Sequence, residues 1–250
     1  GIIVLTIAIL PILGIGGMEL FLAEATGPTA DKLHPRITQT AKRLWYIYLG
    51  LTLSETILFK VAGMSWFDAV NHAMSATATG GFSTRNASIA YFQSPLIEYM
   101  VCLFMFIGGT NFTLIYFGFK GRFYKLYRNE EFKIYMSVVL FFTFIVCMGI
   151  FFLNDTSIEE SFRFSLFQII AVITTTGFVN SDFTSWSSAI TIIFFLLMFV
   201  GASAGSTAGG VKLVRHLIIV KNSILEFKRL LHPSAIIPVR LSKKMIPPKI

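Results

Sequence analysis

The feature that most constrains this chain is a series of apolar stretches, each close to the length that crosses a lipid bilayer. The hydrocarbon core of a bilayer is about 30 Å thick, and an α-helix needs about 20 residues to cross it. Only 14% of the residues are charged, whereas roughly 25% is usual in soluble domains. The sequence therefore predicts an all-α polytopic membrane protein. The candidate spans lie at about 1–15, 43–62, 95–118, 133–153 and 187–220.

Two shorter stretches, 65–79 and 157–174, are moderately apolar and end in turns rich in Thr and Gly. Because they are too short for full spans, we expect re-entrant half-helices that enter the membrane and stop. Superposing Gly81 on Gly177, each followed by Phe, aligns the two turns at an offset of 96 residues. This predicts an internal repeat of membrane helix, pore half-helix and membrane helix. The alternative is chance recurrence of Gly-Phe in a Phe-rich chain.

Basic residues gather in three of the segments that connect the spans. Segments 19–43, 120–133 and 212–250 hold 18 of the 21 Lys and Arg residues. Because such residues are retained on the cytoplasmic side, we expect these segments to face the cytoplasm. The net charge of +8 then follows membrane topology and gives no sign of a nucleic-acid partner. The opposite side is expected to form a mildly acidic vestibule for cations. Its charged residues are Asp68, Glu98, Asp155, Glu159, Glu160 and Asp182 against Lys60, Arg85 and Arg163.

The turns after the half-helices have the composition of a cation site. A helix that stops inside the membrane leaves carbonyl groups without amide partners, and a dehydrated cation can satisfy them. The absence of carboxylates from the turns favours a monovalent ion over a divalent one. Phe82 and Phe178 are expected to pack behind the turns, although ordinary packing explains each Phe equally well. The candidate ligands are Ala78, Thr79, Gly80 and Gly81 in the first turn and Thr175, Thr176 and Gly177 in the second.

A run of small residues at 201–210 interrupts the last apolar stretch. Glycine in a helix interior costs up to about 1 kcal/mol, so the span is expected to break here. Broken backbone at membrane depth is tolerated inside protein or beside water, which predicts a loop that lies under the pore and gates it. Close helix packing through small residues is the alternative. The candidate gate residues are Gly205, Ser206, Thr207, Ala208, Gly209 and Gly210.

Three runs, 78–84, 174–178 and 204–210, resemble the Trk/Ktr/HKT superfamily of potassium transporters, and bacterial Trk membrane subunits are the most similar members. The resemblance covers essentially the whole chain and implies four repeats arranged like a potassium-channel pore. It assigns the filter role to the two turns and the gate role to the loop, with Ala208 where the family commonly has glycine. It also implies a homodimer in the bacterial cytoplasmic membrane and a nucleotide-binding regulatory subunit on the cytoplasmic face.

The same resemblance implies a division of the chain into parts of the four repeats. Residues 1–17 would be the last helix of repeat 1, 18–42 a cytoplasmic connector, 43–119 repeat 2 with its filter at 78–82, 120–132 a second connector, 133–222 repeat 3 with its filter at 174–178, and 223–250 a basic connector toward repeat 4. This chain would then hold two of the four filter segments and represent a fragment of a longer membrane protein.

Other polar residues give weaker signals. The four His residues have no ligand spacing, so we expect no metal beyond K⁺ at the filter, and no cofactor or catalytic constellation is recognisable. Glu55 within a span should face protein, be protonated, or pair with a neighbour such as Lys60. Lys212 and Arg215 would bind lipid, anchor the interface or repel cations, and the sequence leaves the three open. The function predicted is potassium uptake; a secondary transporter of a small organic solute and a structural scaffold are the alternatives.

Overall fold

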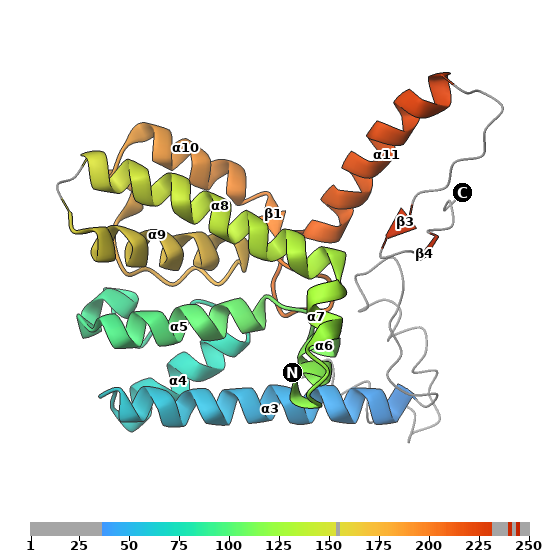
Figure 1. Cartoon of the computed structure of the whole chain (residues 1–250). Coiled ribbons are helices and arrows are strands. Elements are labelled where there is room, and N and C mark those ends of the chain that lie inside the picture. The colour runs from blue at the N-terminus through green and yellow to red at the C-terminus, as the bar shows by residue number, and fades with distance from the viewer. Residues whose placement is uncertain (1–36, 154–155, 232–239, 242–243, 246–250) are drawn as a thin grey trace.

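The computed structural model describes residues 37–153, 156–231, 240–241 and 244–245 (Figure 1). The predicted helix 1–17 and residues His34, Asp155 and His232 lie outside this part. The helices are α3 (Ile37–Val61), α4 (Trp66–Thr77), η2 (Ser88–Phe92), α5 (Pro95–Gly108), α6 (Phe112–Phe119), α7 (Tyr124–Arg128), α8 (Glu130–Leu153), α9 (Ile158–Ile173), η3 (Phe183–Ser185), α10 (Ser188–Leu197) and α11 (Leu213–Leu231). Four short strands are β1 (Val200–Gly201), β2 (Val211–Lys212), β3 (Arg240–Leu241) and β4 (Lys244–Met245); β1 pairs parallel with β2, and β3 antiparallel with β4.

The long helices form one bundle. Figure 1 shows α3, α5, α9, α8 and α10 side by side, with α4 slanting between α3 and α5. Large apolar side chains also cover the outside of the bundle, for example Leu53 and Ile57 on α3 and Phe141 and Phe144 on α8. An outer surface of this kind is what a lipid-facing bundle requires.

Within the described residues, α8 is the helix that is long and apolar enough to cross a membrane alone. The helices α5 and α6 pass the same test only as a pair, bent by 109°. The single span predicted at 95–118 is therefore wrong, because the chain turns at Gly109–Asn111. The predicted break in the last apolar stretch is present, since α10 ends at Leu197 and α11 begins at Leu213.

The two half-helices, α4 and α9, begin in the same way. Ser65 and Ser157 are their N-caps, and each hydroxyl accepts a hydrogen bond from an amide three residues on. The helices end at Thr77 and Ile173, two residues and one residue earlier than the predicted stretches. The two ends are separated by 96 residues, the offset of the sequence repeat, and α9 is longer at its beginning.

The bend after α5 depends on close backbone packing at Gly109. A Cβ atom built on Gly109 would lie 2.6 Å from the Tyr135 hydroxyl and 2.7 Å from Cγ2 of Thr174. These contacts come from α8 and from the turn after α9, so the bend brings the end of α5 against both elements. A side chain at this position would push the layers apart.

We expect Gly109→Ala to destabilise the full-length protein by about 1–3 kcal/mol, because the added methyl overpacks this contact. The matched control is Gly50→Ala, since a Cβ atom built on Gly50 in α3 meets nothing within 4 Å. Thermal unfolding in detergent measures both variants. Equal melting temperatures for the two would contradict the packing argument.

Candidate functional site

The chain after each half-helix turns back over the helix end in the same conformation. Thr79 and Thr175 have φ angles of 52° and 53°, and Gly81 and Gly177 have φ angles of 69° and 79°. Left-handed backbone is uncommon for threonine, so its recurrence at an offset of 96 residues is a structural repeat. The conformation therefore repeats where the Thr- and Gly-rich sequence does.

The turns use the last helix carbonyls and leave those of the turn itself available. Gly80 N donates to Ser75 O at 2.7 Å, and the equivalent Thr176 N donates to Ala171 O at 2.9 Å. In the described part of the chain, no hydrogen bond ends on the carbonyl oxygens of Thr79, Gly80, Gly81, Thr175, Thr176 or Gly177. The oxygens free to meet a cation are therefore those of these six residues. The carbonyl oxygen of Ala78, also a predicted ligand, accepts from Thr79 Oγ1 at 2.7 Å, and the carbonyls of the helix ends that were expected to be free accept hydrogen bonds as well.

The two turns lie against each other. A Cβ atom built on Gly81 would lie 1.9 Å from the carbonyl oxygen of Thr176. With a positive φ as well, Gly81 occupies a place that no L side chain fits. A Cβ atom built on the equivalent Gly177 meets nothing within 4 Å among the described residues. Gly81 is thus the residue at which one turn contacts the next.

The two Phe residues after the turns differ in burial. Phe178 is 1% exposed and its ring lies 5.8 Å from the ring of His72 on α4, as the prediction of packing behind the turn requires. Phe82 is 81% exposed, so the same prediction is wrong for it within the described residues. The reason is that Phe178 packs on the half-helix of the preceding unit, and no preceding unit is described for Phe82.

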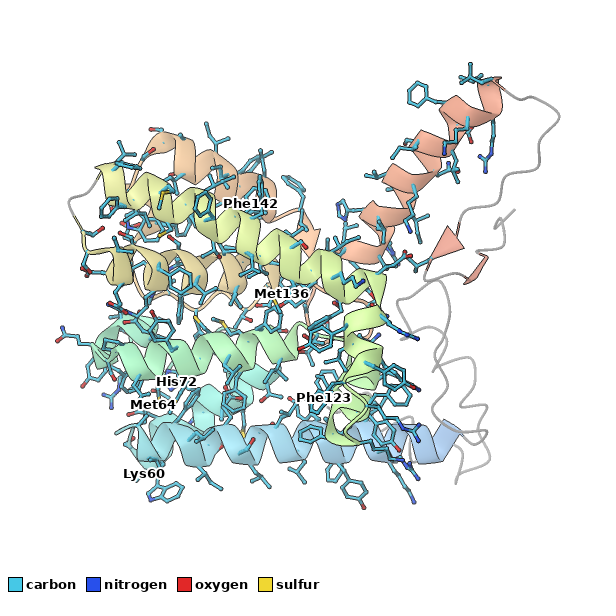
Figure 2. The ribbon with its side chains drawn as sticks, in the orientation of Figure 1. Lys60, Met64, His72, Phe123, Met136 and Phe142 are labelled. Carbon is cyan, nitrogen blue, oxygen red and sulfur yellow. The ribbon has the colours of Figure 1, made fainter. Side chains whose placement is uncertain are left out.

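Polar residues inside the bundle hold the chain that follows each turn. His72 Nδ1 lies 2.7 Å from Asp68 O, and its Nε2 lies 2.8 Å from Ser83 Oγ. Figure 2 shows His72 within the bundle, on the same side of the view as Met64 and Lys60. The equivalent residue 96 positions later is Gln168, which donates to Ser181 O at 2.9 Å. The repeat offset pairs these two residues, although neither was predicted to support a turn.

Several of the outer acids form ion pairs with the outer basic residues. Buried Asp68 accepts from Arg85 at 2.8 Å, and buried Glu98 accepts from Arg163 at 2.7 Å. In the described ranges, Glu160 and Asp182 are the outer acids without an ion pair. Hydrogen bonds donated by the hydroxyl and amide of Thr184 lower the pKa of Asp182, which keeps this exposed carboxylate ionised.

The loop between α10 and α11 lies against the ends of several helices. Ser203 N donates to Gly109 O at 3.0 Å, and Phe112 N donates to Gly205 O at 3.0 Å, which joins the loop to the break between α5 and α6. Gly209 N donates to Thr175 Oγ1 at 2.7 Å. The loop predicted as a gate therefore contacts one of the predicted filter turns directly.

Two charged side chains also hold this loop. Ala204 N donates to Glu131 Oε1 at 2.5 Å, and the Lys212 ammonium donates to Ala208 O. Lys212 is 6% exposed, and its bond to a loop carbonyl is a contact that none of the three alternatives included, whereas Arg215 is exposed. No sequence signal indicated that a lysine ammonium would bond a loop carbonyl.

Glu55 faces protein, as one of its predicted alternatives requires. It is fully buried, and its Oε2 accepts a hydrogen bond from Thr77 Oγ1 at 2.8 Å. It does not pair with Lys60, whose Nζ lies 3.4 Å from Met64 O and 5.7 Å from the ring centre of Trp66. Glu55 therefore ties α3 to the last residue of α4.

Comparison with known proteins identifies the family. The profile of the TrkH family, described as cation transport protein, matches residues 1–250. This chain belongs to the TrkH family. The Trk system potassium uptake protein TrkH of Halomonas elongata is 41% identical over 99% of this chain and 52% of that protein. The protein of the same name from Escherichia coli K12 is 40% identical over 100% of this chain and 52% of that protein, and the Trk system potassium uptake protein TrkG of the same strain is 35% identical over 98% and 51%.

The fold also matches this family. The crystal structure of the potassium transporter TrkH from Vibrio parahaemolyticus superposes with a TM-score of 0.80 at 36% identity, over 96% of this chain and 49% of that one. The prediction of an all-α polytopic membrane protein is confirmed, and TrkH family membership places the chain in the bacterial inner membrane. The chain spans about half the length of the relatives it matches.

We expect Glu55→Ala to destabilise the full-length TrkH family protein by about 1–3 kcal/mol, because it leaves the buried Thr77 hydroxyl without its acceptor. Glu55→Gln is the matched control, since its amide oxygen still accepts that hydrogen bond and the loss should stay under about 1 kcal/mol. Thermal unfolding in detergent distinguishes them. An alanine variant as stable as the glutamine variant would show that the contact is not stabilising.

Proposed function

We propose that the parent protein of this chain carries potassium into the cell through a filter built partly from the two turns. The observation that carries this proposal is the contact of Gly81 with the Thr176 carbonyl, which places two equivalent turns side by side. Carbonyl oxygens arranged in this way replace the hydration shell of an alkali cation. The relatives from Halomonas elongata and Escherichia coli K12 are named potassium uptake proteins, which supports K⁺ as the ion.

The proposed ligands are neutral oxygens. The turns contain no carboxylate, so they lack the charge that a divalent cation site usually provides. The C-terminal ends of α4 and α9 lead directly into these turns, and the partial negative charge of a helix C-terminus adds a favourable potential for a monovalent cation. We assign the filter to Ala78, Thr79, Gly80, Gly81, Thr175, Thr176 and Gly177, and the gate to 205–210.

The wider assembly is also a proposal. We infer that the parent protein has four repeats. This chain holds the last helix of repeat 1 and all of repeats 2 and 3, with the boundaries given above, and the rest of repeat 1 and all of repeat 4 lie outside it. We also infer a homodimer in contact with membrane lipid. The basic cytoplasmic segments would receive a nucleotide-binding regulatory subunit, and the protein would have no enzymatic activity. A secondary transporter for an organic solute predicts uptake that is indifferent to potassium, and a scaffold predicts no flux. Rubidium uptake into vesicles by the intact protein separates these three outcomes.

We expect Gly81→Ser in the full-length protein to lower potassium over sodium selectivity by about tenfold, the factor that corresponds to ~1.4 kcal/mol. The physical reason is that its Cβ atom would displace the Thr176 carbonyl. Gly177→Ser tests the equivalent position of the second turn and should also alter the ratio, because its positive φ would be strained by a side chain. Rubidium and sodium fluxes in proteoliposomes give the ratio. Unchanged ratios in both variants would refute the filter assignment.

We expect removal of residues 206–208 to raise rubidium flux several-fold, because the loop would no longer reach the turns. Selectivity serves as the internal control and should stay near that of the wild type, since both turns are intact. The measurement is initial influx per reconstituted protein. Unaltered flux would favour the interpretation of this loop as a helix-packing segment.

A further inference from the structure

Thr207 lies in the corner between two helix ends. Its Oγ1 donates toward Thr77 O at 2.9 Å and Gly108 O at 3.0 Å, and its amide donates to Gly108 O at 3.2 Å. Thr77 is the last residue of α4, two residues before Thr79 of the first turn, and Gly108 is the last residue of α5. One side chain of the loop therefore connects the first filter turn with the broken membrane helix of repeat 2.

The carbonyls that Thr207 binds are of the kind that most needs a partner. A carbonyl in the last turn of a helix has no amide four residues on to satisfy it. Inside a membrane protein, water replaces a lost partner only where it has access. Moving the loop away from this corner would free both carbonyls at once, so Thr207 opposes displacement of the loop.

The acceptor residue on the filter side is itself held in place. The Thr77 hydroxyl donates to fully buried Glu55 at 2.8 Å, which fixes the end of α4 against α3. A second attachment of the loop, from Gly209 N to Thr175 Oγ1 at 2.7 Å, reaches the other turn. The donor of this second attachment is a backbone amide. Thr207, in contrast, reaches the ends of α4 and α5 through its side chain.

We propose that Thr207 is the latch that holds the gate loop against the filter. It is a positioning residue: its hydroxyl is bonded to carbonyls at the ends of α4 and α5, and it sets how readily the loop withdraws. The proposal rests on the gate function proposed above. It also links the two parts of the site, because the loop cannot leave without breaking contacts to residues at or next to both turns.

The test uses the full-length protein in proteoliposomes with rubidium influx as the measurement. Thr207→Val keeps the shape of the side chain and removes the hydroxyl, and we expect influx to rise about fivefold, the factor for a net hydrogen bond of ~1 kcal/mol. Thr207→Ser keeps the hydroxyl and should restore influx to near the wild-type value. Thr207→Ala is a second variant without the hydroxyl and should behave as Thr207→Val does if the valine protein is not recovered in folded form.

Thr191→Val is the matched control, because it is the same substitution at a threonine of α10, outside the filter turns and the gate loop. The Thr191 hydroxyl donates to Ser187 O at 3.1 Å, a contact at the beginning of its own helix. Influx through this variant should stay within about twofold of the wild type, because it leaves the attachment of the loop to α4 and α5 intact. An equal rise in Thr191→Val and Thr207→Val would overturn the latch, since loss of a threonine hydroxyl anywhere in this region would then explain both.

The remaining outcomes separate this proposal from the gate itself. If removal of 206–208 raises influx while Thr207→Val and Thr207→Ala match the wild type, the loop is a gate but Thr207 is not its latch. If rubidium influx through Thr207→Ser equals that through Thr207→Val, the volume of the side chain and not its hydroxyl controls the loop. The latch proposal is then overturned. If no variant changes influx, including the shortened loop, the gate function fails as well.

Discussion

The structure depends on satisfying backbone groups where helices stop inside the membrane. Two half-helices and two broken membrane helices bring their ends together, and backbone groups at membrane depth need partners. The ends satisfy one another: the loop after α10 donates to carbonyls at the ends of α4 and α5, and Glu131 accepts from the loop in return. The loop after α10 and the ends of α4 and α5 therefore satisfy one another's backbone groups, and the turns retain carbonyl oxygens that are free to bind an ion.

Close approach of these segments requires small residues at a few defined positions. Gly81 allows one turn to touch the carbonyl of the next, and Gly109 lets the bent end of α5 reach α8 and the turn after α9. Thr79 and Thr175 accept a left-handed backbone that threonine seldom adopts, which the contacts around them must hold in place. These contacts therefore hold the turns in position and also oppose movement of the loop between α10 and α11.

The features that could be predicted from the sequence are those that depend on local composition. Length and polarity distinguished the half-helices from spans, and the Thr- and Gly-rich composition of the turns identified both candidate filter segments. The break after α5 was missed because Gly108–Asn111 lies within an apolar run, whose average hydropathy hides four small or polar residues. The paired state of Glu98 was missed for another reason: its partner Arg163 lies on another helix, α9, 65 residues later in the chain. Contacts of that kind are set by packing, which the order of charges along the chain does not contain.

The differences between equivalent residues show how one repeat meets the next. Gly81 of the earlier unit contacts Thr176 of the later unit, and Phe178 of the later unit packs on His72 of the earlier one. If every unit contacted the next in this way, Gly177 would contact a unit that follows it in the sequence, and Phe82 would pack on a unit that precedes it. These are the two equivalent positions that the described residues leave open, and the relatives are about twice as long as this chain. The exposed Phe82 ring and the open space at Gly177 are therefore the two contact surfaces expected of consecutive units from a longer series of repeats.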